Sequence, residues 1–186
     1  SPPAFETPAG GGAWNLIGTA VASSSSDLTI TGLNSTYDTY GIAFSDLIPA
    51  TDAVDACLRF GDSSGIDSGG SDYAWSNHYL QVYSPTSFNI KANNSNSLIN
   101  MTDRYPVGSS TGEGFNGFVY LHTPGDSTTY SSISGQANYF GSAGDPSPGV
   151  IYGARKAVIT LDRIQFFFSS GNVASGRLSV WGIAHA

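Results

Sequence analysis

Residues that could carry acid–base catalysis are few in this chain. Its two glutamates are Glu6 and Glu113, whereas glycoside hydrolysis needs two carboxyl groups facing each other across a cleft. The stretch 108–112, GSSTG, matches the G-x-S-x-G pattern of serine hydrolases. That pattern presents a nucleophile only between a strand and a helix, and the flanking sequences DRYPV and EGFNG are typical of loops. No sequence feature indicates a catalytic pair of aspartates either, so we expect no enzymatic activity.

The usual zinc ligands are also dispersed. His78, His122 and His185 form no His-x-His or His-x-x-x-His pair, and Cys57 is the single cysteine. A zinc site needs three or four such ligands brought together. Cys57 lies in the apolar run 56–60, which indicates a small buried side chain rather than a reactive thiol. We therefore expect neither a metal nor a cofactor.

Three aspartates, Asp62, Asp67 and Asp72, lie five residues apart in the polar stretch 61–77. A calcium loop of the EF-hand type needs oxygen ligands at alternating positions and a closing Glu, and this spacing provides neither. Asp, Ser and Gly are also turn-forming residues. The stretch is interpreted as a solvated loop, with a carboxylate calcium site as the alternative.

Aromatic residues at the end of the same stretch are the best binding candidates. Their rings could stack on sugar rings while neighbouring amide and carboxylate groups bond sugar hydroxyls. The alternative is that the rings pack on the sandwich or at a subunit interface. The candidate glycan-contacting residues are Asp72, Tyr73, Trp75, Asn77, His78 and Tyr79.

Composition narrows the classes of partner. The chain of 186 residues is 40% hydrophobic, which favours a folded core, but only 11% charged, against about 25% in typical globular chains. Its net charge is −7 and its basic residues are scattered, which argues against a nucleic-acid partner. No apolar run approaches the ~20 residues of a membrane-spanning helix, so we expect no membrane insertion.

Residues 1–12, SPPAFETPAGGG, are rich in Pro and Gly and are expected to form a flexible arm. In an assembly, such an arm can lie on another protein. Ser1 is a small residue that fits removal of an initiator Met, and no signal-peptide core follows it, so a whole gene product is expected. Residues 13–186 have a suitable length for a single domain.

From Ala13 onward, apolar and polar residues alternate with a period of two, which predicts strands with one face on a core. The clearest case is the stretch 163–183. Its first part is predicted to direct Phe166 and Phe168 inward and Phe167 outward. A second alternating run, 177–183, follows the polar loop 169–176. The two runs are expected to form a hairpin that closes the fold.

Nine or ten short strands of this kind are predicted, with almost no helix. Long polar stretches at 61–77, 93–114 and 123–149 are interpreted as loops of functional length, with a short strand near 136–140 as an alternative inside the third. The expected fold is all-β: an antiparallel β-sandwich, jelly-roll-like, with long polar loops and an N-terminal arm.

Two stretches together carry a family resemblance: STYDTYGIAFSDLIPATDAVDACLRF at 35–60 and ITLDRIQFFFSSGNVASGRLSVWGI at 159–183. The pair resembles small β-sandwich proteins and domains of tailed-bacteriophage virions, found among tail-fibre and minor structural proteins. The opening at 13–26 fits the same pattern. The resemblance spans about 13–183, with a poorly matched middle.

The resemblance implies a non-enzymatic virion component, assembled in the cytoplasm of the host bacterium. The expected function is a tail-fibre or fibre-tip protein that contacts host surface polysaccharide. The alternatives are a capsid decoration protein that stabilises the phage head, and a carbohydrate-binding module.

The resemblance also implies a homotrimer, and the sequence independently favours an oligomer. Phe167, Tyr83 and Tyr120 occupy positions expected to face outward, and exposed apolar rings mark interfaces. The expected partners are other copies of the chain, other virion proteins through the arm at 1–12, and host polysaccharide.

Overall fold

The computed structural model describes residues 13–82, 86–102 and 105–184. The predicted arm at 1–12 and Tyr83 therefore lie outside the described residues. The described residues form strands and no helix, so they contain no helix long and apolar enough to cross a membrane. The strands are β1 Trp14–Val21, β2 Leu28–Thr31, β3 Thr39–Pro49, β4 Ala56–Asp62, β5 Gly65–Ile66, β6 Tyr73–Gln81, β7 Ser87–Asn96, β8 Ile99–Asn100, β9 Gly114–His122, β10 Ser132–Phe140, β11 Pro146–Arg155, β12 Arg163–Phe168 and β13 Val173–Ile183.

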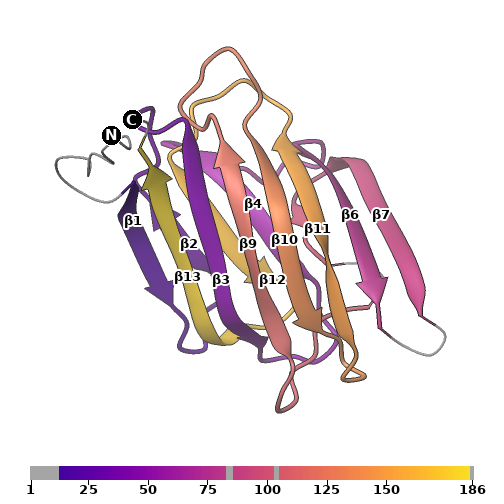
Figure 1. The fold of residues 1–186 in the computed structure, drawn as a ribbon. Coiled ribbons are helices and arrows are strands. Elements are labelled where there is room, and N and C mark those ends of the chain that lie inside the picture. Colours follow the sequence, from indigo (N-terminus) through magenta and orange to yellow (C-terminus); the bar gives the residue numbers. More distant parts are fainter. Residues whose placement is uncertain (1–12, 83–85, 103–104, 185–186) are drawn as a thin grey trace, which may run out of the picture.

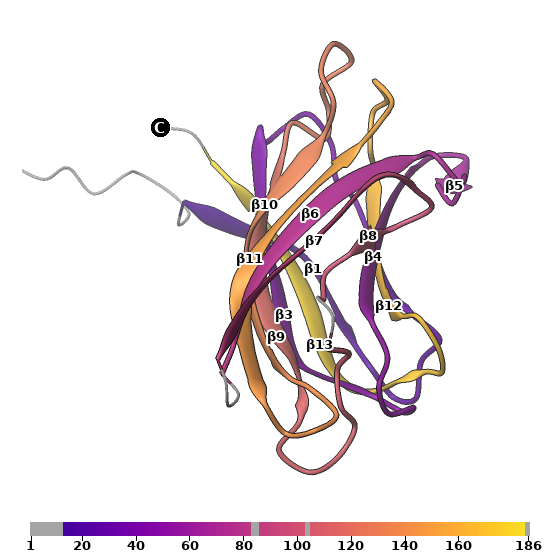
Figure 2. The same ribbon diagram turned by 90° about the vertical axis from the view of Figure 1, so that its right-hand side faces the viewer.

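Two antiparallel sheets pack face to face, which confirms the predicted all-β sandwich (Figures 1 and 2). Sheet A has the order β1-β13-β3-β9-β10-β11-β6-β7, and sheet B has the order β2-β12-β4-β5, with β8 also paired to β4. The first strand pairs with the last and β2 pairs with β12. This nested pairing fits a jelly-roll-like chain path, to which the meander β9-β10-β11 and the hairpin β6-β7 add width in sheet A.

The stretch 163–183 forms two strands as predicted, but they do not form a hairpin. β12 pairs with β2 and β4 in sheet B, whereas β13 pairs with β1 and β3 in sheet A. The connection between them crosses from one sheet to the other, with Gly171 in the left-handed region at φ 69°. Both strands carry apolar residues on one face, and those faces meet across the sandwich instead of lying side by side.

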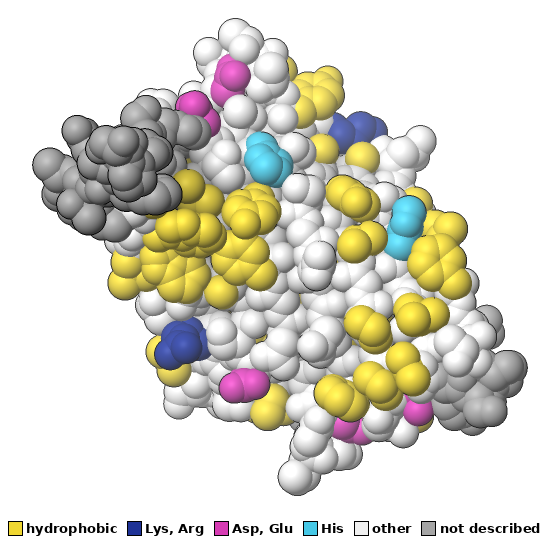
Figure 3. Space-filling model, in the orientation of Figure 1, with side chains coloured by type: hydrophobic (Ala, Val, Ile, Leu, Met, Phe, Trp, Pro, Cys, Tyr) yellow, Lys and Arg dark blue, Asp and Glu magenta, His cyan; other side chains and the backbone are white. Residues whose placement is uncertain are grey.

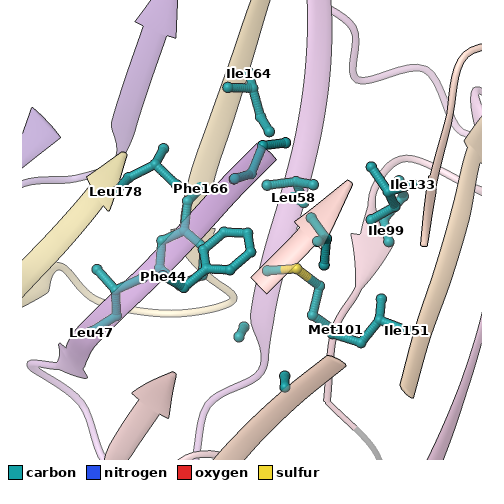
Figure 4. Packing of buried hydrophobic residues seen from close by; sticks show 14 of the residues in the cluster. Phe44, Leu47, Leu58, Ile99, Met101, Ile133, Ile151, Ile164, Phe166 and Leu178 are labelled. Carbon is teal, nitrogen blue, oxygen red and sulfur yellow. The ribbon is translucent and has the colours of Figure 1, made fainter. Parts of the chain in front are cut away.

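Aromatic rings from both sheets fill the centre of the core. Phe44 of β3 and Phe115 of β9 lie with their ring centroids 5.6 Å and 6.0 Å from that of Phe166 on β12. Figure 4 shows Phe44 and Phe166 close together, with Leu178 and Leu58 around them. All of these side chains are buried. Contacts of this kind, made by large rings, fix the two sheets relative to each other.

Several stretches that the sequence indicated as loops contain strands. β6 begins at Tyr73, inside the predicted loop 61–77, and β7 extends into the predicted loop 93–114. The third predicted loop, 123–149, contains β10 and the start of β11. Polar residues dominate these strands because much of their outward face meets solvent. The true connections are therefore shorter than predicted.

The three consecutive phenylalanines of β12 test the assignment of strand faces. Phe166 is fully buried and Phe168 is 3% exposed, so Phe166→Ala and Phe168→Ala should each lower the free energy of unfolding by about 3–5 kcal/mol. Phe167 is partly exposed and its ring stacks on the Arg59 guanidinium at 4.6 Å. Phe167→Ala should cost less, measured by urea unfolding. A larger loss for Phe167→Ala than for the other two would contradict this core.

Candidate functional site

The aromatic residues predicted to contact a glycan lie on β6, and most of them point into the core. Tyr73, Asn77 and Tyr79 are fully buried and Trp75 is 7% exposed. The alternation of a strand directs all four to the same face, and that face packs against sheet B. The site prediction is therefore corrected for these four residues: their side chains face sheet B, and the packing alternative describes them.

These buried side chains attach neighbouring segments to sheet A. The Tyr73 hydroxyl accepts a hydrogen bond from the Phe60 N–H (2.9 Å) and lies 2.9 Å from the Asp67 carbonyl, to which it donates. Asn77 Nδ2 donates to the carbonyls of Asn100 and Thr102. Burial raises the pKa of Tyr73 above its ordinary value, so the hydroxyl keeps its proton and can donate. The Tyr73 hydroxyl and the Asn77 amide thus provide hydrogen-bond partners for buried backbone groups of neighbouring segments.

Asp72 is partly exposed but is held by a cation. Arg155 Nε lies 2.8 Å from Asp67 Oδ2, and Arg155 Nη1 lies 3.3 Å from Asp72 Oδ1. The third aspartate of the series, Asp62, instead accepts hydrogen bonds from Ser64. Within the described residues, no three His, Cys, Asp or Glu side chains come together as a metal-binding group. The arrangement of the aspartates supports anchoring of this segment by Arg155 rather than the calcium alternative.

His78 is the member of the predicted set that points away from the core. Its ring lies edge-on to Phe88 of β7 (6.0 Å between centroids) and to Tyr152 of β11 (6.3 Å). All three residues lie on the outer face of sheet A, the face turned away from sheet B. This face, rather than the end of the sandwich, presents aromatic side chains to solvent.

The outer face of sheet A has two apolar areas with uncharged polar surface between them. Figure 3 shows apolar side chains gathered toward the β1 side and again toward the β6 and β7 side. The first area centres on four rings, which we call the aromatic cluster: Trp14, Phe118, Tyr120 and Trp181. Between the areas lies a groove of about 930 Å³ over β9, β10, β11, β6 and β7.

Neighbouring strands hold the aromatic cluster together. The Trp14 ring centroid lies 5.7 Å from that of Phe118, 6.5 Å from that of Tyr120 and 6.4 Å from that of Trp181. Gly41 of β3 lies beneath the rings, and a Cβ there would overlap the Trp14 and Phe118 side chains. A glycine at this position thus lets the rings cross the central strand of the sheet.

Register across four strands determines the groove. Ser76, Tyr152 and Ser134 lie side by side on β6, β11 and β10, and the next outward row contains Ala74, Ala154, Ser132 and His122. Because the outward residues of these rows are small, the sheet surface is hollow between Tyr152 on one side and His122 on the other. His122 Nε2 lies 3.0 Å from Ser134 Oγ. The groove is therefore shallow, with an apolar floor and with hydroxyl, amide and imidazole groups around it.

Cys57 is buried on β4, and its Sγ donates to the Asp55 carbonyl. Burial raises the pKa of its thiol to about 12, so the reactive thiolate form is suppressed at neutral pH. This agrees with the interpretation of Cys57 as a small buried side chain.

Comparison with known proteins identifies no relative. No protein-family model, curated protein or solved structure matches this chain. The resemblance to phage virion domains stays a prediction from the stretches at 35–60 and 159–183.

Sequence reasoning identified Tyr120 as outward-facing but did not recognise that Trp14, Phe118 and Trp181 form a cluster with it, and it missed Tyr152. The signal that could have found them is the spacing Phe118–Tyr120, together with Trp181, which alternates with the buried Val180. Tyr152 follows a run containing two prolines and a glycine, which obscured its strand.

The correction at β6 can be tested through one hydroxyl. Tyr73→Phe removes the group that bonds Phe60 and Asp67 while keeping the buried ring. It should lower the free energy of unfolding by about 1–3 kcal/mol, because buried backbone groups lose their partner. Tyr130 is 57% exposed, so the control Tyr130→Phe should change stability by less than about 0.5 kcal/mol. Equal stabilities of the two variants in urea unfolding would contradict the assigned network.

Proposed function

We propose that this chain is a non-enzymatic structural protein of a tailed-bacteriophage virion, a tail-fibre or fibre-tip component. Its copies pack together through the aromatic cluster and present the rest of sheet A to the host surface. The β-sandwich fold agrees with this role, and the stretches at 35–60 and 159–183 support the assignment to a virion. The observation that carries the assembly role is the exposure of the aromatic cluster.

The exposure of this cluster is unusual for a free surface. Trp14 is 44% exposed, the adjacent Leu16 is 60% exposed, and Tyr120 is 40% exposed. Contiguous exposed apolar surface of this kind marks sites of interaction with other macromolecules. Tryptophan and tyrosine are also the residues that contribute most to binding energy at protein interfaces.

The relative orientation of the rings favours a protein partner over a sugar at this place. The Trp14 ring is tilted by 47° to Phe118, 59° to Tyr120 and 64° to Trp181. Rings at these angles share no common plane on which successive sugar rings could stack. They instead form an uneven surface into which side chains of a second copy can interdigitate.

The size of the face suits a specific interface. The chain exposes 8912 Å², and a standard interface of about 800 Å² per partner would cover roughly a tenth of it. The aromatic cluster and Leu16 would occupy the centre of such an area, with polar residues of β3 and β10 at its rim. No member of the cluster is charged, so association would not strand a charge in the interface.

Assembly can be measured by light scattering at micromolar concentration. The chain should have a mass that is a multiple of 19.3 kDa, three copies being expected. The double variant Trp14→Ser/Tyr120→Ser should weaken association by about 30-fold or more, because truncation of even one aromatic hot-spot residue costs about 2 kcal/mol or more. A matched control is Tyr130→Ser/Val158→Ser, which removes two exposed apolar side chains elsewhere. A single-chain mass for the unaltered protein would overturn assembly through this face.

The virion role needs a separate experiment. Electron microscopy of phage particles that carry the gene, labelled with antibody to this chain, should place the label on the tail. Label on the head would favour the capsid decoration function instead. Particles without label would overturn the virion proposal, and glycan binding by the free chain would then favour the carbohydrate-binding module.

A further inference from the structure

We propose that the groove on the outer face of sheet A binds a neutral oligosaccharide, with the Tyr152 ring stacked on one of its sugar rings. This inference rests on the proposed display of sheet A to the host, and it names the class of ligand and the place where it binds. It moves the expected glycan contact from the end of the sandwich to the middle of a sheet.

The volume and shape of the groove suit an extended ligand. Its volume of about 930 Å³ is near the upper end of the range of about 300–1,000 Å³ for small-molecule sites. Ala74, Ala92 and Ala154 contribute to its floor, and Tyr152 and His122 contribute to its sides. A chain of several sugars can lie along such a groove without rearrangement of the sheet.

Tyr152 has the properties of a stacking residue. Its side chain is 47% exposed although it lies on β11, inside the sheet rather than at an edge. The His78 ring approaches it at 72°, which supports its orientation through an edge contact. A ring held in place at an exposed position loses little conformational freedom when a ligand binds. Its apolar surface is available to the CH groups of a sugar ring.

Polar groups around Tyr152 match the hydroxyls of a sugar. Ser76, Ser132 and Ser134 provide hydroxyl groups that both donate and accept hydrogen bonds. Such groups, spread along the groove beside one aromatic ring, fit a ligand that carries hydroxyls on every unit.

The charge of the groove selects among glycans. No residue that lines it is Asp, Glu, Lys or Arg, and the Lys156 ammonium beside it already donates to the Asn94 carbonyl, so the lining itself offers an anionic sugar no ion pair. The chain as a whole carries a net charge of −7, which further disfavours acidic polysaccharides. Catalysis has no support here either, because the groove presents no carboxylate pair to a glycosidic bond. These features favour neutral hexoses and N-acetylhexosamines.

Binding at one groove is expected to be weak, and assembly would compensate for it. A shallow site with one stacking ring is consistent with millimolar affinity. Linked copies on one particle raise the overall affinity by about 10²–10⁴-fold without new contacts. The groove and the aromatic cluster lie on the same face of sheet A and adjoin on β9, where the Tyr120 and His122 rings stack with their centroids 6.4 Å apart. Both can therefore be occupied together if copies contact one another on the β1 side of Tyr120.

The test uses the full chain and a panel of hexasaccharides observed by ligand-detected NMR and titration. The panel contains neutral hexamers of glucose and of N-acetylglucosamine, with a hyaluronan hexamer as the anionic control. At least one neutral hexamer should bind, and the hyaluronan hexamer should bind at least tenfold more weakly. Tyr152→Ala should weaken binding of the neutral hexamer at least tenfold, whereas Tyr130→Ala should leave it unchanged.

A second variant keeps the inference testable if Tyr152→Ala disturbs the fold. Ser134→Tyr leaves Tyr152 in place and fills the groove, so it should also abolish binding. Binding that survives both variants, binding of the hyaluronan hexamer alone, or failure of every neutral hexamer to bind would each overturn the inference. The mass by light scattering separates this result from the proposed assembly, because Tyr152→Ala should leave the oligomeric mass unchanged.

Discussion

Buried tyrosine hydroxyls that must find backbone partners constrain the whole sandwich. The rings of Tyr40, Tyr73, Tyr79 and Tyr139 are fully buried, and each hydroxyl donates to a backbone carbonyl of another segment. An unpaired hydroxyl in the core would cost about 1–3 kcal/mol. Each tyrosine therefore fixes a connecting segment as well as a strand face. With its inner face determined in this way, sheet A has no freedom to change which residues face outward.

The outer face of sheet A follows from that constraint, because a strand that directs one set of residues inward directs the other set to solvent. The result is two surfaces with different chemistry on one sheet. Mutually tilted rings near β1 are suited to packing against protein, and a neutral, hydroxyl-lined groove beside Tyr152 is suited to a sugar. Gly41 leaves space for the rings of the aromatic cluster to pack above it, which forms a raised area. The small residues of the groove leave the sheet surface hollow there.

Local alternation was sufficient to predict the sandwich and the inward side chains of β12, including Phe166 and Phe168. It could not predict that β12 and β13 belong to different sheets, because the pairing partner of a strand depends on residues far away in the sequence. The stretch 61–77 was interpreted as one loop because its Gly, Ser and Asp residues hide the start of β6. Consequently Tyr73 and Trp75 were candidates for surface contact with a glycan, with packing as the alternative. The groove was not predictable, since it arises from the register of four strands.

Hydroxyl-radical footprinting with mass spectrometry tests the central claim, the division of sheet A into an assembly surface and a glycan surface. Three tyrosines of comparable exposure in the single chain provide the comparison: Tyr120 at 40%, Tyr152 at 47% and Tyr130 at 57%. In the purified protein at micromolar concentration, Tyr120 should oxidise much more slowly than Tyr130. Tyr152 should oxidise as readily as Tyr130 and become protected when a neutral hexasaccharide is added. Oxidation of Tyr120 at the rate of Tyr130, with Tyr152 unaffected by any sugar, would contradict the account.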